Sequence, residues 1–179
     1  MSYLVLSCSL NPASRSRVLA RRAADLIESR GEPVAFADLR DYALPICNAG
    51  DCYEHPDVQR LAALIREARG VLLATPVYNY AASASAKNLV ELTGSAWTNQ
   101  LVGFLCAAGG RSSYMAIMAL ANSLMLDFRA IVLPRFVFTD ETDFNGDAFA
   151  DENIDNRLGD LAQTLVTLGA AIGTVKNRD

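Results

Sequence analysis

The segment Tyr3-Leu-Val-Leu-Ser-Cys-Ser-Leu-Asn-Pro-Ala-Ser-Arg-Ser16 joins a short apolar run to a loop rich in hydroxyl groups. The run over residues 3–7 is continuous rather than alternating, which is typical of a strand buried on both faces of a sheet. Residues 14–29 then carry apolar side chains at helical spacing and stop before Gly31. A buried strand that passes through a polar loop into an amphipathic helix predicts the start of a parallel α/β sheet.

The same alternation continues along the rest of the chain. Further strands are predicted over residues 33–38, 70–75, 101–107 and 130–138, and helices over 57–69, 82–92, 112–126 and 152–172. We expect Pro76 to end the third strand, and Pro134 predicts an edge position or a bulge in the fifth. No repeat or linker divides the chain, so residues 1–179 are predicted to form a single flavodoxin-like domain. Its architecture would be a three-layer sandwich, with a five-stranded parallel sheet of order 2-1-3-4-5 and helices on both faces.

Composition and charge narrow the class of protein. The 179 residues are 51% hydrophobic and 20% charged, with a formal net charge of −4, which is typical of a soluble globular protein. The negative balance gives no reason to expect nucleic acid or an anionic membrane as a partner. The segment Met1–Leu10 has no basic start, and its apolar run is too short to span a bilayer. We therefore expect a cytoplasmic protein.

The four cysteines are expected to be reduced in that compartment. Cys47 and Cys52 are five residues apart, which is not the spacing of a Cys-x-x-Cys redox or zinc motif. His55 is the only histidine, so a metal site is poorly supplied with ligands. Structural thiols are the favoured interpretation, and a redox or metal role for the Cys47/Cys52 pair stays open as the alternative.

In open α/β sheets, ligands bind beyond the carboxyl ends of the strands, where the strand order reverses. The loop after the first strand offers hydroxyls at Ser9, Ser14 and Ser16, an amide at Asn11 and a guanidinium at Arg15. The free N–H groups and the positive end of the following helix favour a phosphate there. A single helix cap would require only one of these serines, so we expect the loop to bind an anion. The loop lacks both the Gly-Lys-Ser/Thr ending of a Walker A motif and a Gly-x-Gly-x-x-Gly fingerprint, which favours a mononucleotide phosphate.

Two other loops are predicted to meet the first. In Thr75-Pro-Val-Tyr-Asn-Tyr80, the tyrosines and the backbone N–H groups suit a planar ring with a polar rim, although the segment is also compatible with an ordinary turn. In Ala107-Ala-Gly-Gly-Arg-Ser-Ser113, the glycines allow close approach to a ligand, and Arg111 would neutralise an electron-rich ring. A simple glycine turn is the alternative there.

Together these loops resemble a known family. Ser9-Leu-Asn-Pro-Ala-Ser-Arg-Ser16 resembles the Gly-Ser-x-Arg-x-x-Ser-x-Asn phosphate loop of NADPH-dependent FMN reductases. Pro76-Val-Tyr-Asn79, followed by Lys87-Asn88, resembles their Pro-Glu-Tyr-Asn…Lys-Asn segment, and Ala108-Gly-Gly-Arg111 resembles their glycine-rich loop. The resemblance runs in order and spacing from Tyr3 to about Phe138.

The resemblance implies a bound FMN that takes hydride from NADPH or NADH and reduces a small acceptor such as free flavin, a quinone or an azo compound. It also implies a homodimer or homotetramer in which a neighbouring subunit helps to wall the flavin site. No catalytic side chain is expected, because the hydride passes between cofactors. The cofactor-binding residues carried over by position, with Arg15 added for its charge, are Ser9, Asn11, Ser14, Arg15 and Ser16 for the phosphate; Pro76, Val77, Tyr78 and Asn79 for the isoalloxazine; and Gly109, Gly110 and Arg111 for its pyrimidine edge.

The chain departs from the family pattern at several positions. Asn11 stands where the family often has arginine, so Arg15 is expected to supply the charge, and Val77 replaces a common glutamate. Phe138-Thr-Asp-Glu-Thr-Asp143 looks like the reductases that supply reduced flavin to two-component monooxygenases, which implies such a partner. A flavodoxin-type electron carrier is the alternative function, disfavoured by the weak net charge. A non-enzymatic binding domain on the same fold is the third.

Overall fold

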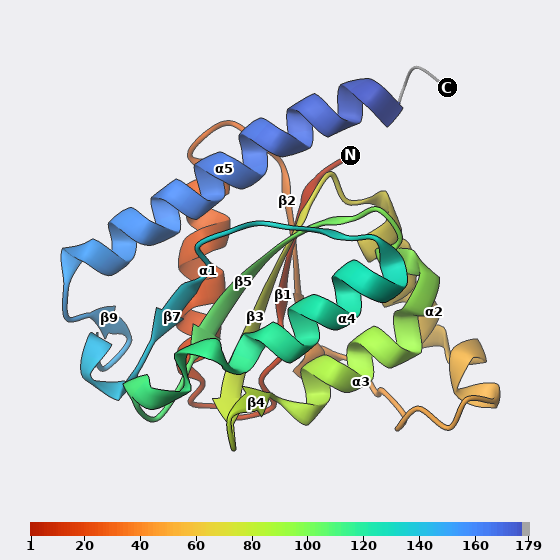
Figure 1. Cartoon of the computed structure of the whole chain (residues 1–179), viewed down its shortest axis with the longest axis horizontal. Coiled ribbons are helices and arrows are strands. Elements are labelled where there is room, and N and C mark those ends of the chain that lie inside the picture. Colours follow the sequence, from red (N-terminus) through yellow and green to blue (C-terminus); the bar gives the residue numbers. More distant parts are fainter. Residues whose placement is uncertain (177–179) are drawn as a thin grey trace.

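A parallel sheet lies between two layers of helices in the computed structural model, which describes residues 1–176 (Figure 1). The order along the sheet is β2-β1-β3-β5-β6, and β7 also pairs with β5. The strands are β1 (Tyr3–Ser7), β2 (Val34–Asp38), β3 (Val71–Tyr78), β5 (Leu101–Ala107), β6 (Ile131–Val132) and β7 (Val137–Thr139). Because β6 and β7 are two pieces of one edge strand, the predicted order 2-1-3-4-5 is confirmed.

The edge strand is interrupted, as Pro134 predicts. Ile131 lies opposite Leu101 and Val137 lies opposite Leu105, so the edge strand uses six residues where β5 uses four. Arg135, within the interruption, has a positive φ of 59°. The two extra residues form a bulge, which is one of the places in a sheet that tolerate a proline.

The prediction that Pro76 ends the third strand is wrong. Strand β3 continues through Pro76, which lies opposite Ala107 of β5, and ends at Tyr78. The Pro76 carbonyl accepts a hydrogen bond from the Ser83 N–H at 3.1 Å. A strand residue directs its N and its C=O to the same side, so the missing N–H faces away from β5 and leaves that ladder intact.

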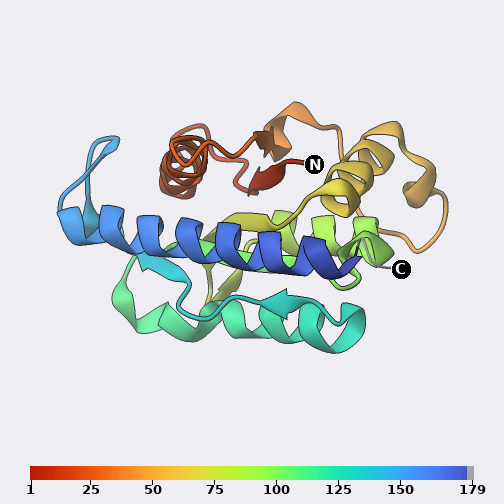
Figure 2. The same cartoon turned by 90° about the horizontal axis from the view of Figure 1, so that it is seen from above.

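Helices cover both faces of the sheet (Figures 1 and 2). Helices α1 (Arg15–Glu28) and α5 (Glu152–Lys176) pack on one face, and α2 (Pro56–Glu67), α3 (Ala84–Thr93) and α4 (Met118–Phe128) pack on the other. Alternate residues of β1 divide between the two cores: Leu4 and Leu6 belong to the core under α2, α3 and α4, whereas Tyr3 and Val5 belong to the core under α1 and α5. This division explains the continuous apolar run in the sequence.

Several short strands and 3-10 turns complete the structure. Strand β4 (Ala81–Ala82) pairs back on β3, and β8 (Phe144–Asn145) with β9 (Ala148–Phe149) forms a separate hairpin. The helix predicted from residue 112 begins as a 3-10 helix, Arg111–Ile117, before α4. The other 3-10 turns are Leu39–Asp41, Asp51–Glu54, Gly94–Trp97 and Glu141–Asp143. Among residues 1–176, no helix is both long and apolar enough to cross a membrane.

Candidate functional site

A cavity of about 690 Å³ lies where the loops after β1, β3 and β5 meet, at the carboxyl ends of these strands. Of the residues expected to bind the cofactor, Ser9, Asn11, Ser14, Arg15, Ser16, Pro76, Val77, Tyr78, Asn79 and Gly109 line it, with Ala13, Ala107 and Ala108. Gly110 and Arg111 are not among the lining residues. The parallel order of β1, β3 and β5 brings these distant segments to one edge.

The serine loop holds its hydroxyl groups at the start of α1. Ser14 is the N-cap, and its Oγ accepts a hydrogen bond from the Arg17 N–H at 3.3 Å and lies 2.9 Å from Ser16 Oγ. Ser9 Oγ accepts from the Asn11 N–H at 3.3 Å. The three serines are buried, and the first turn of α1 carries no acidic residue. The arrangement therefore presents hydroxyls and the positive end of a helix without a competing carboxylate.

Arg17 holds this loop from outside, a role that the sequence interpretation did not find. Its guanidinium donates to the carbonyl oxygens of Pro12 at 3.0 Å, and of Ser9 and Asn11 at 3.2 Å. Its Nε donates to Asp38 Oδ2 at 2.6 Å. Three carbonyl oxygens of the loop thus point toward Arg17. The opposite side of the loop is therefore available to the hydrogen-bond donors of the loop.

Asp38 anchors this arrangement at the end of β2. It is only 3% exposed, and Arg40 donates to the same carboxylate at 2.9 Å. Burial alone would raise the pKa of Asp38, but hydrogen bonds from Arg40 and Arg17 outweigh it and hold the pKa below its usual value. The only signal in the sequence was an aspartate at the end of the strand that pairs with β1, where Ser7 lies opposite Asp38.

The second loop is a tight hairpin between β3 and β4. Asn79 and Tyr80 both have positive φ, 50° and 63°, as a type I′ turn requires at its two central residues. Val77 is buried in the cavity wall, whereas the Tyr78 side chain is 54% exposed. The hairpin therefore offers an apolar wall and an accessible aromatic ring at the mouth of the cavity.

The third loop differs from expectation at Arg111. Its Nε donates to Asp140 Oδ2 at 2.7 Å and its Nη2 donates to Asp143 Oδ1 at 3.3 Å. The side chain lines an adjacent cavity of about 370 Å³ instead of the one described above. A hydrogen bond from the Thr142 hydroxyl, opposed by burial and helped by Arg111, holds the pKa of Asp140 below its usual value. The acidic stretch after β7 thus draws Arg111 away from the expected position.

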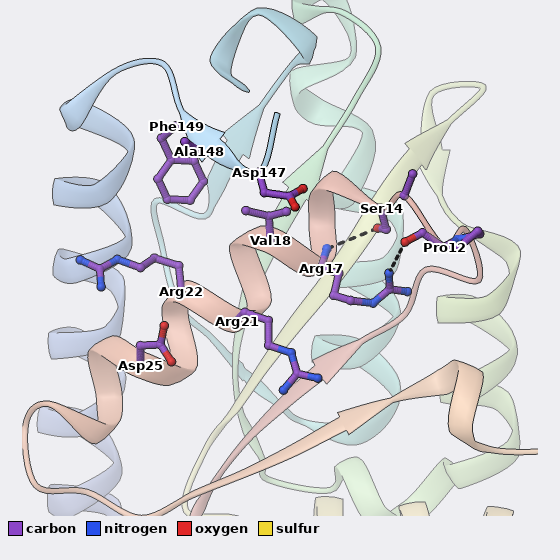
Figure 3. A pocket seen from close by; sticks show the side chains of 11 residues that line it. Pro12, Ser14, Arg17, Val18, Arg21, Arg22, Asp25, Asp147, Ala148 and Phe149 are labelled. Atoms are coloured by element: carbon purple, nitrogen blue, oxygen red, sulfur yellow. Dashed lines mark hydrogen bonds between the residues drawn. The ribbon is translucent and has the colours of Figure 1, made fainter. Parts of the chain in front are cut away.

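A third cavity, of about 540 Å³, lies between α1 and the β8–β9 hairpin (Figure 3). Its arginines have partners within the chain. Arg22 donates to both carboxylate oxygens of Asp155, at 2.5 and 2.7 Å, and the Arg21 guanidinium lies 3.7 Å from the centroid of the Phe36 ring. Because these cations are engaged, the cavity is a weaker candidate for an anionic ligand than the serine loop.

Comparison with known proteins gives the family context. A sequence model described as NADPH-dependent FMN reductase matches residues 1–144. The chain is 29% identical over 142 residues to an NADPH azoreductase from a Bacillus species, covering 78% of this chain and 77% of the relative. It is 30% identical over 115 residues to an FMN reductase (NADPH) from Pseudomonas putida, covering 63% of this chain and 57% of that protein.

Solved structures share the fold over nearly the whole length. An oxidoreductase from Corynebacterium diphtheriae matches with a TM-score of 0.77 and 21% identity, covering 96% of this chain and 98% of the other. A flavoenzyme NAD(P)H:(acceptor) oxidoreductase from Paracoccus denitrificans matches with a TM-score of 0.76 and 21% identity, covering 95% and 97%. These similarities extend the flavodoxin-like fold to the residues beyond 144.

Proposed function

This chain belongs to the NADPH-dependent FMN reductase family, and from that premise we propose that it holds FMN in the cavity formed by the serine loop, the β3–β4 hairpin and Gly109. It is an NAD(P)H-dependent flavin oxidoreductase. When bound, FMN supplies the hydride chemistry, accepting from the nicotinamide and passing the reducing equivalents to a small acceptor. The family assignment favours this enzyme over the electron-carrier alternative.

The observation that carries the proposal is the set of donors at the start of α1. Three hydroxyls, those of Ser9, Ser14 and Ser16, lie in one cavity. They are beside the N-terminus of α1, whose first turn has no acidic residue. A helix N-terminus carries roughly half a positive charge, and the exposed guanidinium of Arg15 adds a full one. These groups suit a phosphate that carries close to two negative charges. Asn11 then contributes a neutral amide. Arg15 provides the positive charge that the family often takes from an arginine at the position of Asn11.

The rest of the cavity suits a flat ring. Its volume of about 690 Å³ is within the usual range for small-molecule sites, roughly 300–1,000 Å³. A Cβ built on Gly109 meets no protein atom within 4 Å, so the backbone there is open to a ligand. Val77 gives an apolar wall, and the hairpin backbone of Tyr78 and Asn79 provides polar groups for the ring edge. These groups bind and orient the ring, and no proton transfer by them is needed.

The phosphate assignment is tested by a Ser14→Ala/Ser16→Ala double variant. Each hydrogen bond to a charged group contributes about 1.5–3 kcal/mol, so we expect FMN affinity to fall by roughly 100-fold or more. Riboflavin, which lacks the phosphate, is the matched ligand control and should bind wild type and variant alike. Flavin fluorescence quenching measures both affinities. Unchanged FMN affinity in a folded variant would show that the phosphate lies elsewhere.

For the acceptor, we propose a small, planar oxidant such as a flavin or an azo compound. The names of the relatives from Pseudomonas and Bacillus support these two classes. The exposed ring of Tyr78 at the cavity mouth suits stacking with a planar molecule. Steady-state NADPH and NADH oxidation with free FMN or an azo dye as acceptor tests the proposal.

We also propose that a second copy of the chain covers the exposed apolar side chains around α4. Met115, Met125 and Leu126 are 50%, 37% and 85% exposed, and Tyr114 is 45% exposed. This supports the predicted homo-oligomer. Light scattering on wild type and a Leu126→Glu variant tests it, and we expect the variant to have a lower mass.

We also propose a cytoplasmic location and a flavin-dependent monooxygenase as partner. The monooxygenase partner rests on the resemblance of residues 138–143, and within the chain Asp140 and Asp143 of that stretch already bind Arg111.

A further inference from the structure

The loop between β2 and α2 brings Cys47 and Cys52 together, outside the proposed flavin cavity. Cys47 packs against the small cluster that contains Cys52, the Asn48 N–H donates to Cys52 Sγ at 3.5 Å, and Cys47 Sγ lies 3.6 Å from the Tyr53 hydroxyl. Cys52 is buried and packs with Val58 and Leu92, whereas Cys47 is half-buried at the edge of this cluster. The pair therefore combines one sheltered sulfur with one that solvent can reach.

Several hydrogen bonds fix the turn that joins the two cysteines. Asn48 Oδ1 accepts from the N–H groups of Gly50 at 3.0 Å and Cys52 at 3.4 Å, and Ala49 takes a positive φ of 56°. At the start of the turn, Asn88 of α3 accepts from the Cys47 N–H at 2.9 Å. The chain is thus folded back on itself before any bond joins the sulfurs.

The surroundings of Cys52 favour its thiolate. Burial alone would raise the pKa of Cys52, but N–H groups of Asn48 and Gly50 and the Cys47 thiol outweigh it and lower the pKa below the ordinary value. Cys8 and Cys106 are different, because burial raises the pKa of both thiols, that of Cys106 to about 12. Of these three thiols, only that of Cys52 is favoured as a thiolate.

We propose that Cys47 and Cys52 form a reversible disulfide when the protein meets a hydroperoxide. The Cys47 sulfur attacks a peroxide oxygen and breaks the O–O bond, and its thiol proton passes to the leaving oxygen, giving a sulfenic acid and water (an alcohol for an organic hydroperoxide). The Cys52 thiolate then attacks the sulfenic sulfur, forms the S–S bond and releases hydroxide. One peroxide is reduced by two electrons, and two thiols become one disulfide.

The structure favours this step. A disulfide needs an S–S length of about 2.05 Å, and the turn fixed by Asn48 already places the Cys47 side chain against the cluster that contains Cys52. A metal site is a poorer alternative, since no group of three or more His, Cys, Asp or Glu within residues 1–176 is arranged to hold a metal ion. The proposal does not depend on flavin binding.

Peptide mapping after hydrogen peroxide treatment tests the proposal. Protein is exposed to a small excess of peroxide, blocked with N-ethylmaleimide under denaturing conditions and digested with trypsin. Residues 41–60 form one tryptic peptide that contains both cysteines. We expect this peptide to be lighter by two hydrogen atoms and to lack maleimide, and dithiothreitol treatment before blocking should restore two maleimide adducts.

The same digest contains its own controls. Cys8 falls in peptide 1–15 and Cys106 in peptide 88–111, and both should keep their maleimide adducts after peroxide. Cys47→Ser and Cys52→Ser variants should form no disulfide within peptide 41–60. Full alkylation of peptide 41–60 in peroxide-treated wild type, or oxidation to sulfinic acid without a disulfide, would overturn the proposal.

Discussion

Arg17 shows how one side chain outside a binding cavity shapes it. Its guanidinium collects three carbonyl oxygens of the serine loop and one carboxylate, and its side chain is only 12% exposed. Without it these carbonyls would lose their donors, and the loop would be free to turn acceptors toward the phosphate. Arg17 is therefore a positioning residue for the proposed FMN site.

An Arg17→Gln variant should bind FMN at least tenfold more weakly than wild type, the change that about 1.4 kcal/mol produces. Arg21→Gln is the matched control, because Arg21 lies one turn further along α1 and stacks on Phe36. Fluorescence titration with FMN and with riboflavin measures the effect. If Arg17→Gln and Arg21→Gln bind FMN equally well, the positioning role is wrong.

Gly109 and Gly110 form a second matched pair. A Cβ at either meets no protein atom within 4 Å, but only Gly109 lines the cavity. We expect Gly109→Ala to weaken flavin binding by steric overlap with the ring, and Gly110→Ala to leave it unchanged, while both fold normally. Dissociation constants for FMN and thermal unfolding of the apoproteins distinguish these outcomes. Equal affinities would place the ring away from Gly109.

The role of a residue could be predicted from the sequence only where its partners lie close to it along the chain. Three hydroxyls exceed what one helix cap requires, which predicted a shared site for Ser9, Ser14 and Ser16, and the structure brings all three to one cavity. Arg17 was not, because its partners are backbone carbonyls and an aspartate some twenty residues away. The ion pairs of Arg111 could not be predicted, because Asp140 and Asp143 reach it only after β7 folds beside β5.

At the scale of elements, the ion pair between Asp38 and Arg17 joins the end of β2 to the start of α1. Protonation of Asp38 in acid should break this pair. The folded-state pKa of Asp38 lies below its usual value, so its contribution to stability is complete above about pH 4. That contribution is lost as the pH falls through the folded-state pKa. Asp38→Asn should therefore be less stable than wild type at pH 7, and the difference should narrow below pH 4. Urea unfolding at both pH values measures it, and a difference independent of pH would contradict the assignment.

The elements themselves were largely predictable, because continuous apolar runs mark strands buried on both faces. The exceptions have local causes. Strand β3 extends through Pro76 because the missing N–H faces the β4 side, and β4 itself is too short to give a pattern. Pro134 did mark the bulge that divides the edge strand, since a proline at a sheet edge has few other positions.

At the scale of the whole molecule, β5 is packed so closely that a methyl group at Gly103 would force neighbouring side chains to shift. A Cβ there would approach Leu72 Cδ2 to 2.7 Å and Leu133 Cδ1 to 3.2 Å. Gly103→Ala should lower the free energy of unfolding by about 1–3 kcal/mol, as overpacking of a core typically does. Urea unfolding tests this, with Gly110→Ala as the control that should stay near wild type. A Gly103→Ala protein as stable as wild type would mean that the face beneath α5 repacks without cost.

Helix α5 lies beyond residues 1–144, yet one face of the sheet depends on it. Its Leu158, Leu161 and Leu165 are buried against the strands, and its Val166 carbonyl accepts a hydrogen bond from the Tyr3 hydroxyl at 3.0 Å. Tyr3 of β1 thus has a hydrogen-bond partner that lies 163 residues later in the chain. At roughly 5–20 residues per second, about ten seconds or more separate the synthesis of these two partners, so this contact can form only late in synthesis.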